Sequence, residues 1–295
     1  MTELEFQDVL TVDRRCIEEE LHTYLTNKRT DPDLDEVIDA VEYTMFSGGK
    51  RLRPILAMEV CRACGKDPLL ALRSGCAVEF VQAASIVQDD LPLIDDSDLR
   101  RGRAALHVEY GDSTALLASD AMFAMAFDLL LQDNLNNRDF RRFMEATLEA
   151  IDVNGLIGGE FLDIENEQKE LGVEAVRKIY ETKTEPLFLM AARFGAYKAN
   201  ASGKKLAAIE EYAKNIGLCF QVIDDILDVT QSEAVLQKVV GKDAGKTTYP
   251  SLLGVDGAKR EAERLTARAI EALEPFGTRG EVLRMLARWM CDRIY

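Results

Sequence analysis

Histidine is scarce in this chain, since only His22 and His107 occur among 295 residues. Neither belongs to a Ser-His-Asp or Cys-His pattern that would predict nucleophilic catalysis, and neither is predicted to bind a metal. Positive charge is also in deficit, because 36 lysines and arginines stand against 52 acids, for a net charge of −16. A nucleic-acid surface needs a basic patch, so DNA and RNA are excluded as expected partners.

Cysteine pairing and long apolar runs are missing as well. The six cysteines are scattered and predict no disulfide framework. Cys61 and Cys64 have CxxC spacing without a second pair, so we interpret them as core thiols. No apolar run reaches about 18 residues without a charge, which predicts no transmembrane segment. The acidic N-terminal residues resemble no signal segment, and a cytoplasmic protein is the expectation.

Strand-like alternation is scarce, and no linker rich in proline or serine divides the chain. Apolar residues recur instead at three- and four-residue steps, which is typical of helices. We therefore predict an all-α fold, a multi-helix bundle forming a single domain over residues 1–295. Helices are expected at residues 6–27, up to about 46, from Pro54, at 69–91, 115–132, 140–156, 173–194 and 206–229, and twice within 259–293.

Two aspartate clusters each end a long apolar run. The first spans residues 89–95 (DDLPLID) and the second residues 224–228 (DDILD). Carboxylates in such places repel one another and cost free energy to desolvate unless cations hold them together. Oxygen ligands suit Mg²⁺, which usually takes one or two carboxylates and completes its shell with water and substrate phosphates. Two facing clusters therefore predict a metal-bridged diphosphate site.

The spacing within each cluster has a geometric consequence. Asp224 and Asp228 are four residues apart and share a helix face, with Gln221 close to that face. Pro92 lies inside the first cluster, so the helix should end there and the chain should curl back. Acids at a helix C-terminus oppose the helix dipole, and a bound cation would remove that conflict.

Six motifs in a fixed order resemble the trans-isoprenyl diphosphate synthases, also called polyprenyl synthetases. They are GGKRLRP at 48–54, the first cluster with LRRG at 99–102, Gly158-Gly159 with Asp163, Lys183-Thr184, QVIDDILD at 221–228 and KTTYP at 246–250. The resemblance covers residues 47–253, and six ordered motifs make a chance agreement very improbable. It implies the isoprenoid synthase fold, a helical bundle around a central apolar cavity.

The resemblance also implies how a metal site would be built. In this family an allylic diphosphate lies between the two clusters on three Mg²⁺ ions. By position, Asp89 and Asp95 would hold two ions and Asp224 the third. Waters and ligands around the ions would be oriented by Asp90, Asp225 and Asp228.

Cationic residues match the family's diphosphate-binding positions. Those for the allylic diphosphate are Arg100, Lys183 and Lys242, and those for isopentenyl diphosphate are Lys50, Arg51, Gln82 and Arg101. Guanidinium groups suit phosphate oxygens because they donate two parallel hydrogen bonds. The developing carbocation would be stabilised by dipoles of Thr184, Gln221 and the Lys183 carbonyl.

The implied reaction is the head-to-tail condensation of isopentenyl diphosphate with dimethylallyl, geranyl or farnesyl diphosphate. The allylic diphosphate ionises, the double bond of isopentenyl diphosphate attacks the cation, and a proton is lost. The product is a short-chain all-trans prenyl diphosphate, and diphosphate is released. The resemblance also implies a homodimer, with the apolar helix at residues 115–131 as its expected interface.

Five positions depart from the common pattern of the family. Gln82 and Gln88 stand where many relatives have histidine, and Glu160 stands where glutamine is common. Ser119 replaces a glycine, and Glu185 replaces a small residue. None of these changes removes a metal ligand, and we interpret them as adjustments of affinity.

Product length is expected to depend on the helix that leads to Asp89. One turn before it lie Ser85 and Ala84, where relatives that stop at fifteen carbons often have an aromatic ring. Such a ring closes the bottom of the apolar tunnel in which the product grows. The small side chain of Ala84 leaves the tunnel open at this level, and Val81 and Phe80 are candidates for closing it further down. A twenty-carbon product is therefore slightly favoured over fifteen, with longer products as a further alternative, and Ala84→Phe is expected to shorten the product.

Three other functions compete with this interpretation. A class I terpene cyclase would share the first cluster but normally carries an Asn/Ser/Glu triad as its second metal site. A squalene-type synthase has differently spaced acids and lacks the GGKR motif. A non-catalytic regulatory subunit of a heteromeric synthase tends to lose aspartates, whereas both clusters are complete here.

Overall fold

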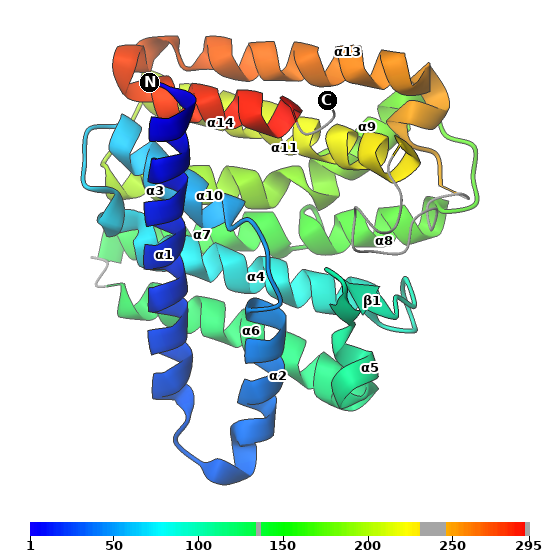
Figure 1. Cartoon of the computed structure of the whole chain (residues 1–295). Coiled ribbons are helices and arrows are strands. Elements are labelled where there is room, and N and C mark those ends of the chain that lie inside the picture. Colours follow the sequence, from blue (N-terminus) through cyan, green and yellow to red (C-terminus); the bar gives the residue numbers. More distant parts are fainter. Residues whose placement is uncertain (134–136, 231–245, 293–295) are drawn as a thin grey trace.

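The computed structural model describes residues 1–133, 137–230 and 246–292. These residues form helices and one short hairpin (Figure 1). The elements are α1 (Glu3–Lys28), η1 (Pro32–Leu34), α2 (Asp35–Met45), α3 (Leu52–Ala63), η2 (Pro68–Ala71), α4 (Leu72–Asp90), β1 (Leu99–Arg100), β2 (Arg103–Ala104), α5 (Leu106–Tyr110), α6 (Asp112–Gln132), α7 (Asn137–Ile151), α8 (Leu156–Asn166), α9 (Val173–Lys183), α10 (Glu185–Lys198), α11 (Lys204–Thr230), α13 (Tyr249–Ala272), η4 (Glu274–Gly280) and α14 (Glu281–Cys291). The predicted all-α class is confirmed.

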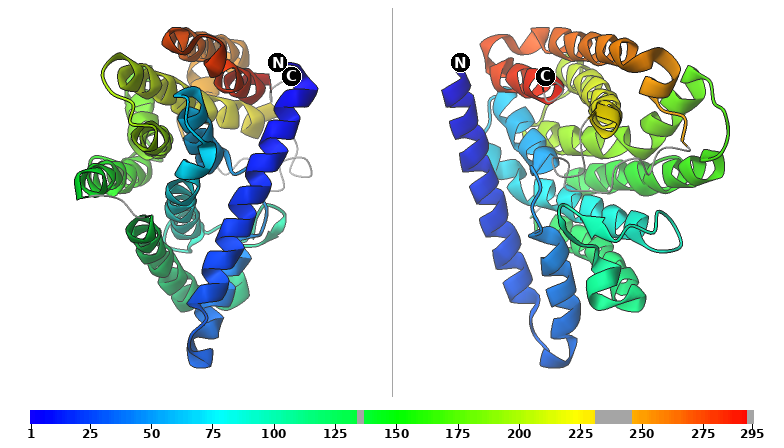
Figure 2. Two further views of the ribbon diagram at one scale, coloured as in Figure 1. Left: turned by 90° about the vertical axis from the view of Figure 1, so that its left-hand side faces the viewer. Right: turned by 45° about the vertical axis from the view of Figure 1, so that its right-hand side comes forward.

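The long helices lie side by side in layers, and α1 crosses them on the outside (Figures 1 and 2). α4 packs against α3 and α6, while α11 packs against α10 and α13. The larger buried apolar cluster draws side chains from Phe6 to Met290, and a second one joins α9, α11 and α13. The assignment of residues 1–295 to a single domain stays a prediction.

Local sequence explains where several helices begin. Thr2 caps α1, because its hydroxyl accepts from the Glu5 amide while the Glu5 carboxylate accepts from the Thr2 amide. Thr248 caps α13 in the same way with Ser251. α13 therefore starts ten residues before the helical region expected at 259–293. That region is divided at η4, around Pro275, where the sequence predicts the boundary between two helices.

The helix predicted at residues 173–194 is wrong as a single element. The structure divides it into α9 and α10, which meet at Thr184. Pro186 stands in the first turn of α10, where a residue without an amide hydrogen is tolerated. The apolar periodicity continues through the break, which is why the sequence pattern missed it. The break places Lys183 and Thr184 at a helix junction rather than on a helix face.

The C-terminal end of α4 folds back as the sequence predicts. α4 stops at Asp90, and Pro92 follows in an irregular turn. The Asp95 amide donates to the Asp89 carbonyl at 2.9 Å, so the chain returns toward the helix end. The Ser97 amide donates to the Asp90 carbonyl at 3.1 Å. These bonds bring the Asp95 backbone beside that of Asp89 without continuing the helix.

α8 and α9 approach each other through a glycine. A Cβ atom on Gly159 would lie 2.3 Å from the Lys183 backbone nitrogen, and one on Gly158 would lie 1.9 Å from the Val153 carbonyl oxygen. Real Cβ atoms do not approach backbone so closely, so these positions require glycine. Gly159 therefore allows the α8 and α9 backbones to touch, while Gly158 makes room for the chain segment just before α8.

Two helical segments are long and apolar enough to cross a membrane by length and composition alone. They are Pro68–Asp90 and Asp112–Gln132. The first is mostly buried inside the bundle, while α6 leaves Leu116, Leu117 and Leu131 exposed. Burial in the core explains the apolar character of the first segment, and the absence of a membrane span stays a prediction.

A buried carboxyl pair joins α1 to α3 and gives a prediction for stability. Burial and a hydrogen bond to Asp13 raise the pKa of Glu59 from 4.5 to about 8. Arg62 pairs with both acids, and Tyr212 from α11 also faces Glu59. The folded state therefore holds a proton that the unfolded chain releases above pH 4.5. Stability from this pair should be complete below pH 4.5 and should be lost as the pH rises through about 8.

Glu59→Gln is expected to flatten this pH dependence, because glutamine cannot titrate but still donates to Asp13. Melting temperatures measured across this pH range in both proteins would test it. The exposed Glu170→Gln variant is the control and should follow the wild type. A Glu59→Gln variant whose melting temperature falls with pH as steeply as the wild type would contradict the assignment.

Candidate active site

A cavity of about 590 Å³ opens where the predicted motifs meet. Its walls come from the start of α3, the last turns of α4, the hairpin, the α9–α10 junction and α11. The lining residues are Arg14, Ser47, Gly48, Gly49, Lys50, Arg51, Leu52, Arg53, Glu79, Gln82, Ser85, Ile86, Asp89, Arg100, Arg101, Leu156, Lys183, Thr184, Phe220, Gln221, Asp224 and Leu227. The cavity thus joins segments that lie more than 170 residues apart in the chain.

The first aspartate cluster lies at one side of this cavity. Asp89 lines it, and the turn described above places Asp95 nearby. Asp90 is buried instead, and it accepts hydrogen bonds from Arg100 Nε with both carboxylate oxygens, at 3.1 and 3.0 Å. Arg100 also lines the cavity, so Asp90 fixes the direction of a cationic side chain that was predicted to bind phosphate.

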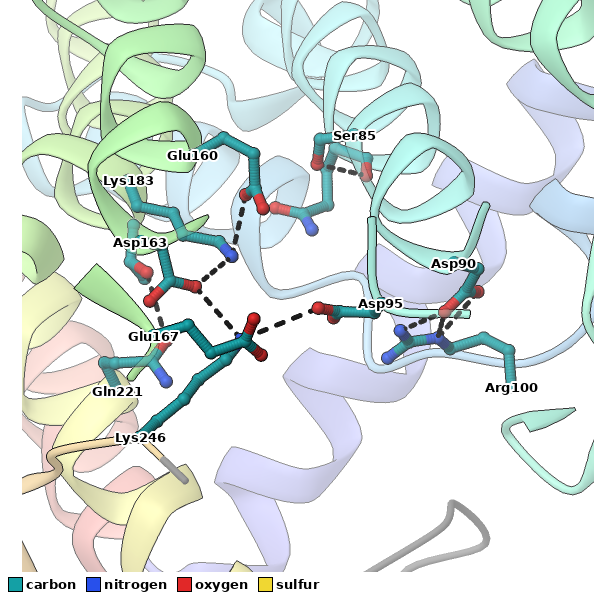
Figure 3. A network of polar contacts seen from close by, with 12 residues as sticks. Ser85, Asp90, Asp95, Arg100, Glu160, Asp163, Glu167, Lys183, Gln221 and Lys246 are labelled. Carbon is teal, nitrogen blue, oxygen red and sulfur yellow. Dashed lines mark hydrogen bonds and ion pairs between the residues drawn. The ribbon is translucent and has the colours of Figure 1, made fainter. Parts of the chain in front are cut away.

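Lys183 stands among carboxylates on the opposite wall. Its ammonium lies 2.7 Å from Glu160 and 2.9 Å from Asp163, both on α8 (Figure 3). Burial opposes the charged form of Lys183, but Asp89, Asp163 and Glu160 outweigh it and raise its pKa. Glu160, one of the departures from the family pattern, thereby adds a negative charge to this wall.

Burial raises the pKa of Asp89 to about 8, and the nearby charges of Glu160 and Asp95 act in the same direction. Lys183 counteracts this rise but does not cancel it. The ionised form of Asp89 is therefore disfavoured, first by burial and then by the neighbouring acids, at the position where the sequence predicts a divalent cation. A cation bound there would favour the ionised carboxylate.

Lys246 is a site residue to which its sequence motif alone assigned no role. Its ammonium lies 3.5 Å from both Asp95 and Asp163 and 3.7 Å from Glu167, so it bridges the first cluster and α8 (Figure 3). The signal was available, because Lys246 opens the KTTYP motif. Lys242, the predicted partner in this region, lies outside the described residues.

The second cluster is anchored by Asp225. This buried carboxylate accepts from the Tyr180 hydroxyl at 2.6 Å and from the Tyr249 amide at 3.4 Å, joining α9 and α13 to α11. It also accepts from the Gln221 side chain at 3.3 Å. Asp228 is buried as well, and Asp224 is the member of the cluster that lines the cavity.

Gln221 and Thr184 form a short polar chain at the cavity wall. The Thr184 hydroxyl donates to the Gln221 carbonyl oxygen at 3.0 Å, and Asp225 holds the amide nitrogen of the same glutamine. Gln221 is therefore oriented from both ends. The structure brings together Lys183, Thr184 and Gln221, as the sequence predicted for residues near a developing cation.

The GGKRLRP motif contains two arginines with different surroundings. Arg51 borders the cavity, but its buried guanidinium donates to Glu79 at 2.9 Å and to the Met45 carbonyl oxygen. Arg53 lies with its guanidinium carbon 4.5 Å from the Phe188 ring centre. The Nε atoms of both arginines lack a hydrogen-bond partner among the described residues, so the two differ in the bonds of the Arg51 terminal nitrogens. Burial lowers the Arg53 pKa to about 10. Arg53, which was not among the predicted site residues, is thus better placed for an anionic ligand than Arg51.

The remaining cationic wall comes from the hairpin and the glycine turn. Arg101 stands at the tip of the β1–β2 hairpin with a φ of 54° and donates to the Gly48 carbonyl oxygen. A Cβ on Gly49 would lie 2.9 Å from the Arg101 guanidinium, so the glycine makes room for it. Lys50 and Gln82 also line the cavity. Four of the predicted contacts for isopentenyl diphosphate therefore border one space: Lys50, Arg51, Gln82 and Arg101.

The predicted chain-length residues divide into two groups. Ser85 lines the cavity on the same face of α4 as Gln82 and Asp89. Phe80, Val81 and Ala84 are fully buried and are not among the described residues that line this cavity. Ser119 on α6 donates to the Ala84 carbonyl oxygen at 3.1 Å, which holds α6 against this face of α4.

The arrangement of the carboxylates suits Mg²⁺, which also takes water and phosphate as ligands, better than a metal whose ligands all come from the protein. Among the described residues, no three acidic, histidine or cysteine side chains are grouped closely enough to hold one ion. Asp89, Asp95 and Asp224 instead offer separate oxygen ligands around a cavity rimmed by cations. Mg²⁺ takes one or two carboxylates and leaves positions for water and phosphate, which agrees with this spread.

Solved structures resemble this chain over nearly its whole length. The Zymomonas mobilis FPP/GFPP synthase structure superimposes with a TM-score of 0.86 at 28% identity, covering 97% of this chain and 99% of that one. A Helicobacter pylori geranyltransferase solved with magnesium and isoprenyl diphosphate gives a TM-score of 0.82 at 25% identity, with 97% of each chain covered.

Sequence similarity leads to the same group. Geranylgeranyl pyrophosphate synthase 3, chloroplastic, of Arabidopsis thaliana is 40% identical over 248 residues, which is 81% of this chain and 69% of that protein. The family model for polyprenyl synthetase matches residues 35–284, and this range contains both aspartate clusters and all the cavity residues named above except Arg14. The chain belongs to the polyprenyl synthetase family.

Proposed function

We propose that this chain is a magnesium-dependent prenyltransferase that condenses isopentenyl diphosphate head-to-tail with an allylic diphosphate. The observation that carries the proposal is one cavity with acids from both clusters on its walls and two groups of cations at its rim. The product would be a short-chain all-trans prenyl diphosphate, with diphosphate released. Relatives named as geranylgeranyl synthases support the short-chain class.

The acids and three cations on one side suit the allylic diphosphate. Asp89, Asp95 and Asp224 would hold Mg²⁺, with three ions expected from the family, and the Helicobacter pylori complex supports the identity of the metal. When bound, the metal supplies positive charge that stabilises the departing diphosphate. Lys183, Lys246 and Arg100 would bind the same diphosphate, because each already faces a carboxylate of this wall.

The other diphosphate fits the wall built by the glycine turn and the hairpin. Arg53, Arg101 and Lys50 present cations there, and Gln82 adds an amide. Arg51 would stabilise the fold of this wall rather than bind phosphate, since its guanidinium donates to Glu79 and to the Met45 carbonyl oxygen. We therefore assign the predicted phosphate-binding role of Arg51 to Arg53.

Bond changes follow from these positions. The allylic C–O bond breaks and its electron pair leaves with the diphosphate, while the double bond of isopentenyl diphosphate forms the new C–C bond. A proton is lost from the carbon next to the resulting cation, and the released diphosphate can accept it. The oriented oxygen of Gln221 and the Thr184 hydroxyl offer negative dipole ends to the positive charge without bonding to it.

The decisive experiment is incubation with Mg²⁺, isopentenyl diphosphate and primers of five, ten or fifteen carbons, with products sized by chain length. Elongation of at least one primer is the expected result. A folded sample that elongates none of them would refute the synthase and favour the regulatory-subunit alternative.

We propose that a twenty-carbon product is slightly favoured over a fifteen-carbon product, because a serine rather than an aromatic ring lines the cavity one turn before Asp89. Ser85→Phe should place a ring in the cavity and shorten the longest product by at least one five-carbon unit. Chromatography of the products would measure this change. An unaltered product distribution would show that growth does not pass Ser85.

Ala84→Phe is the matched comparison. Ala84 is fully buried against α6, so a ring there must displace the helix that carries Ser119. Overpacking of this kind costs about 1–3 kcal/mol. We expect a lower melting temperature in addition to the shorter product that the sequence analysis predicts. A shorter product at an unchanged melting temperature would indicate that Ala84 faces open space.

A homodimer in the cytoplasm completes the proposal. Exposed apolar side chains on α6, α7 and α8 form the best candidate for the dimer surface, namely Leu116, Leu117, Leu131, Leu148, Ile157, Phe161 and Ile164. Large apolar side chains in such number on neighbouring helices are typical of an interaction surface. Sedimentation of the purified protein would determine whether it is dimeric.

A further inference from the structure

The chain has a single tryptophan, Trp289, and it lies beside the proposed isopentenyl diphosphate site. The Lys50 ammonium is 5.0 Å from the centre of the Trp289 ring. A cation at this distance from an indole face is attracted by the ring's quadrupole. Trp289 belongs to none of the sequence motifs, and it comes from α14, at the opposite end of the chain from Lys50.

The ring is carried by a firmly packed helix. One face of α14 is buried through Val282, Leu283, Leu286, Ala287 and Met290. The Tyr212 hydroxyl of α11 donates to the Leu283 carbonyl oxygen at 2.7 Å, which ties α14 to the helix of the second cluster. Trp289 itself is half-buried against the same core. Its ring is therefore a fixed surface rather than a mobile one.

The Trp289 ring offers such a surface to the Lys50 ammonium. Lys50 lies in the irregular segment between α2 and α3, its side chain is exposed, and it lines the mouth of the cavity. A lysine side chain has several rotatable bonds, and fixing it on a ligand costs rotamer freedom. An ammonium already held over an indole face loses less of that freedom when a diphosphate binds.

We propose that Trp289 is a positioning residue that holds the Lys50 ammonium at the mouth of the isopentenyl diphosphate site. The inference rests on the proposed function of Lys50 as a ligand of that diphosphate. Trp289 does not touch the reacting atoms. It acts through Lys50, so its effect falls on the affinity for isopentenyl diphosphate, and the allylic side of the cavity stays unchanged.

Trp289→Leu removes the ring quadrupole but keeps an apolar side chain in the core. It should raise KM for isopentenyl diphosphate by about 2- to 5-fold, with kcat and the KM of the allylic primer unchanged. Trp289→Phe retains an aromatic face and should restore most of the affinity. The matched control is Met285→Ala in the same helix, which should lower the melting temperature without this selective change in KM. An unchanged KM for isopentenyl diphosphate in Trp289→Leu, or an equal rise of that KM in Met285→Ala, would overturn the proposal.

Fluorescence gives a second test that does not depend on turnover. Because Trp289 is the only tryptophan, its emission should change when inorganic pyrophosphate binds the Lys50 ammonium that lies over its ring. The change should disappear in Lys50→Met. Emission of the wild-type protein that stays constant at saturating pyrophosphate would overturn the proposal even if a Trp289 variant failed to fold. A wild-type protein without condensation activity would refute the proposed function instead, and the fluorescence titration would still decide the contact.

Discussion

Asp224→Ala is expected to lower kcat by about three orders of magnitude and to leave the fold intact. Asp224 is the α11 acid that lines the cavity, whereas the neighbouring Asp225 carries the contacts to Tyr180 and Tyr249. Charge stabilisation by a bound metal is worth several kcal/mol, and about 4 kcal/mol corresponds to roughly a thousandfold in rate. Steady-state kinetics at saturating Mg²⁺, together with a melting curve, would measure both parts of the prediction.

Asp98→Ala is the control for that loss. Asp98 follows the first cluster closely in sequence, but its side chain is exposed and is not among the described residues that line the cavity. Its activity should match that of the wild type. Asp224→Ala activity within about tenfold of the wild type would contradict the assignment, since that difference is only about 1.4 kcal/mol.

Arg51→Met is expected to lose stability, whereas Arg53→Met is expected to lose affinity for isopentenyl diphosphate. Removing Arg51 leaves Glu79 buried without its partner, which costs about 3–5 kcal/mol and should lower the melting temperature by roughly 10 °C. Removing Arg53 leaves an apolar side chain between Phe188 and Phe220 and should preserve the fold. Its KM for isopentenyl diphosphate should rise by about 10- to 150-fold, because a charge-assisted hydrogen bond is lost.

Melting curves and kinetics on both variants separate the two roles. The reverse pattern, a stable Arg51→Met protein with impaired substrate binding and a normal Arg53→Met enzyme, would return the ligand role to Arg51. Reduced binding in both variants with equal melting temperatures would show that the pair with Glu79 contributes little to stability.

The sequence predicted the parts of the site that depend on short-range chemistry. Pro92 required α4 to end, and the turn that follows does bring Asp95 back to Asp89. The four-residue spacing in the second cluster placed Asp224 and Asp228 on one helix. Such features follow from local backbone geometry, so they can be inferred without knowing which helices pack together.

What the sequence could not provide depended on tertiary contacts. Arg51 and Arg53 stand in one motif, and only the buried position of Glu79 on α4 decides which of them is held by the protein. Lys246 and Asp163 are 83 residues apart, so their pairing depends on how α8 meets the start of α13. The break at Thr184 was missed because apolar periodicity continued through it, although Pro186 was visible.

Gly159 shows that the width of the site is not set by its charged residues. Glu160 is the next residue on α8, and its ion pair with Lys183 is 2.7 Å long because the two backbones touch at the glycine. Any larger residue at 159 would separate the helices and stretch that pair, although no charge had changed. The strength of the ion pair on this wall therefore depends on residue 159 being a glycine, because only a residue without a side chain lets the two helices approach so closely.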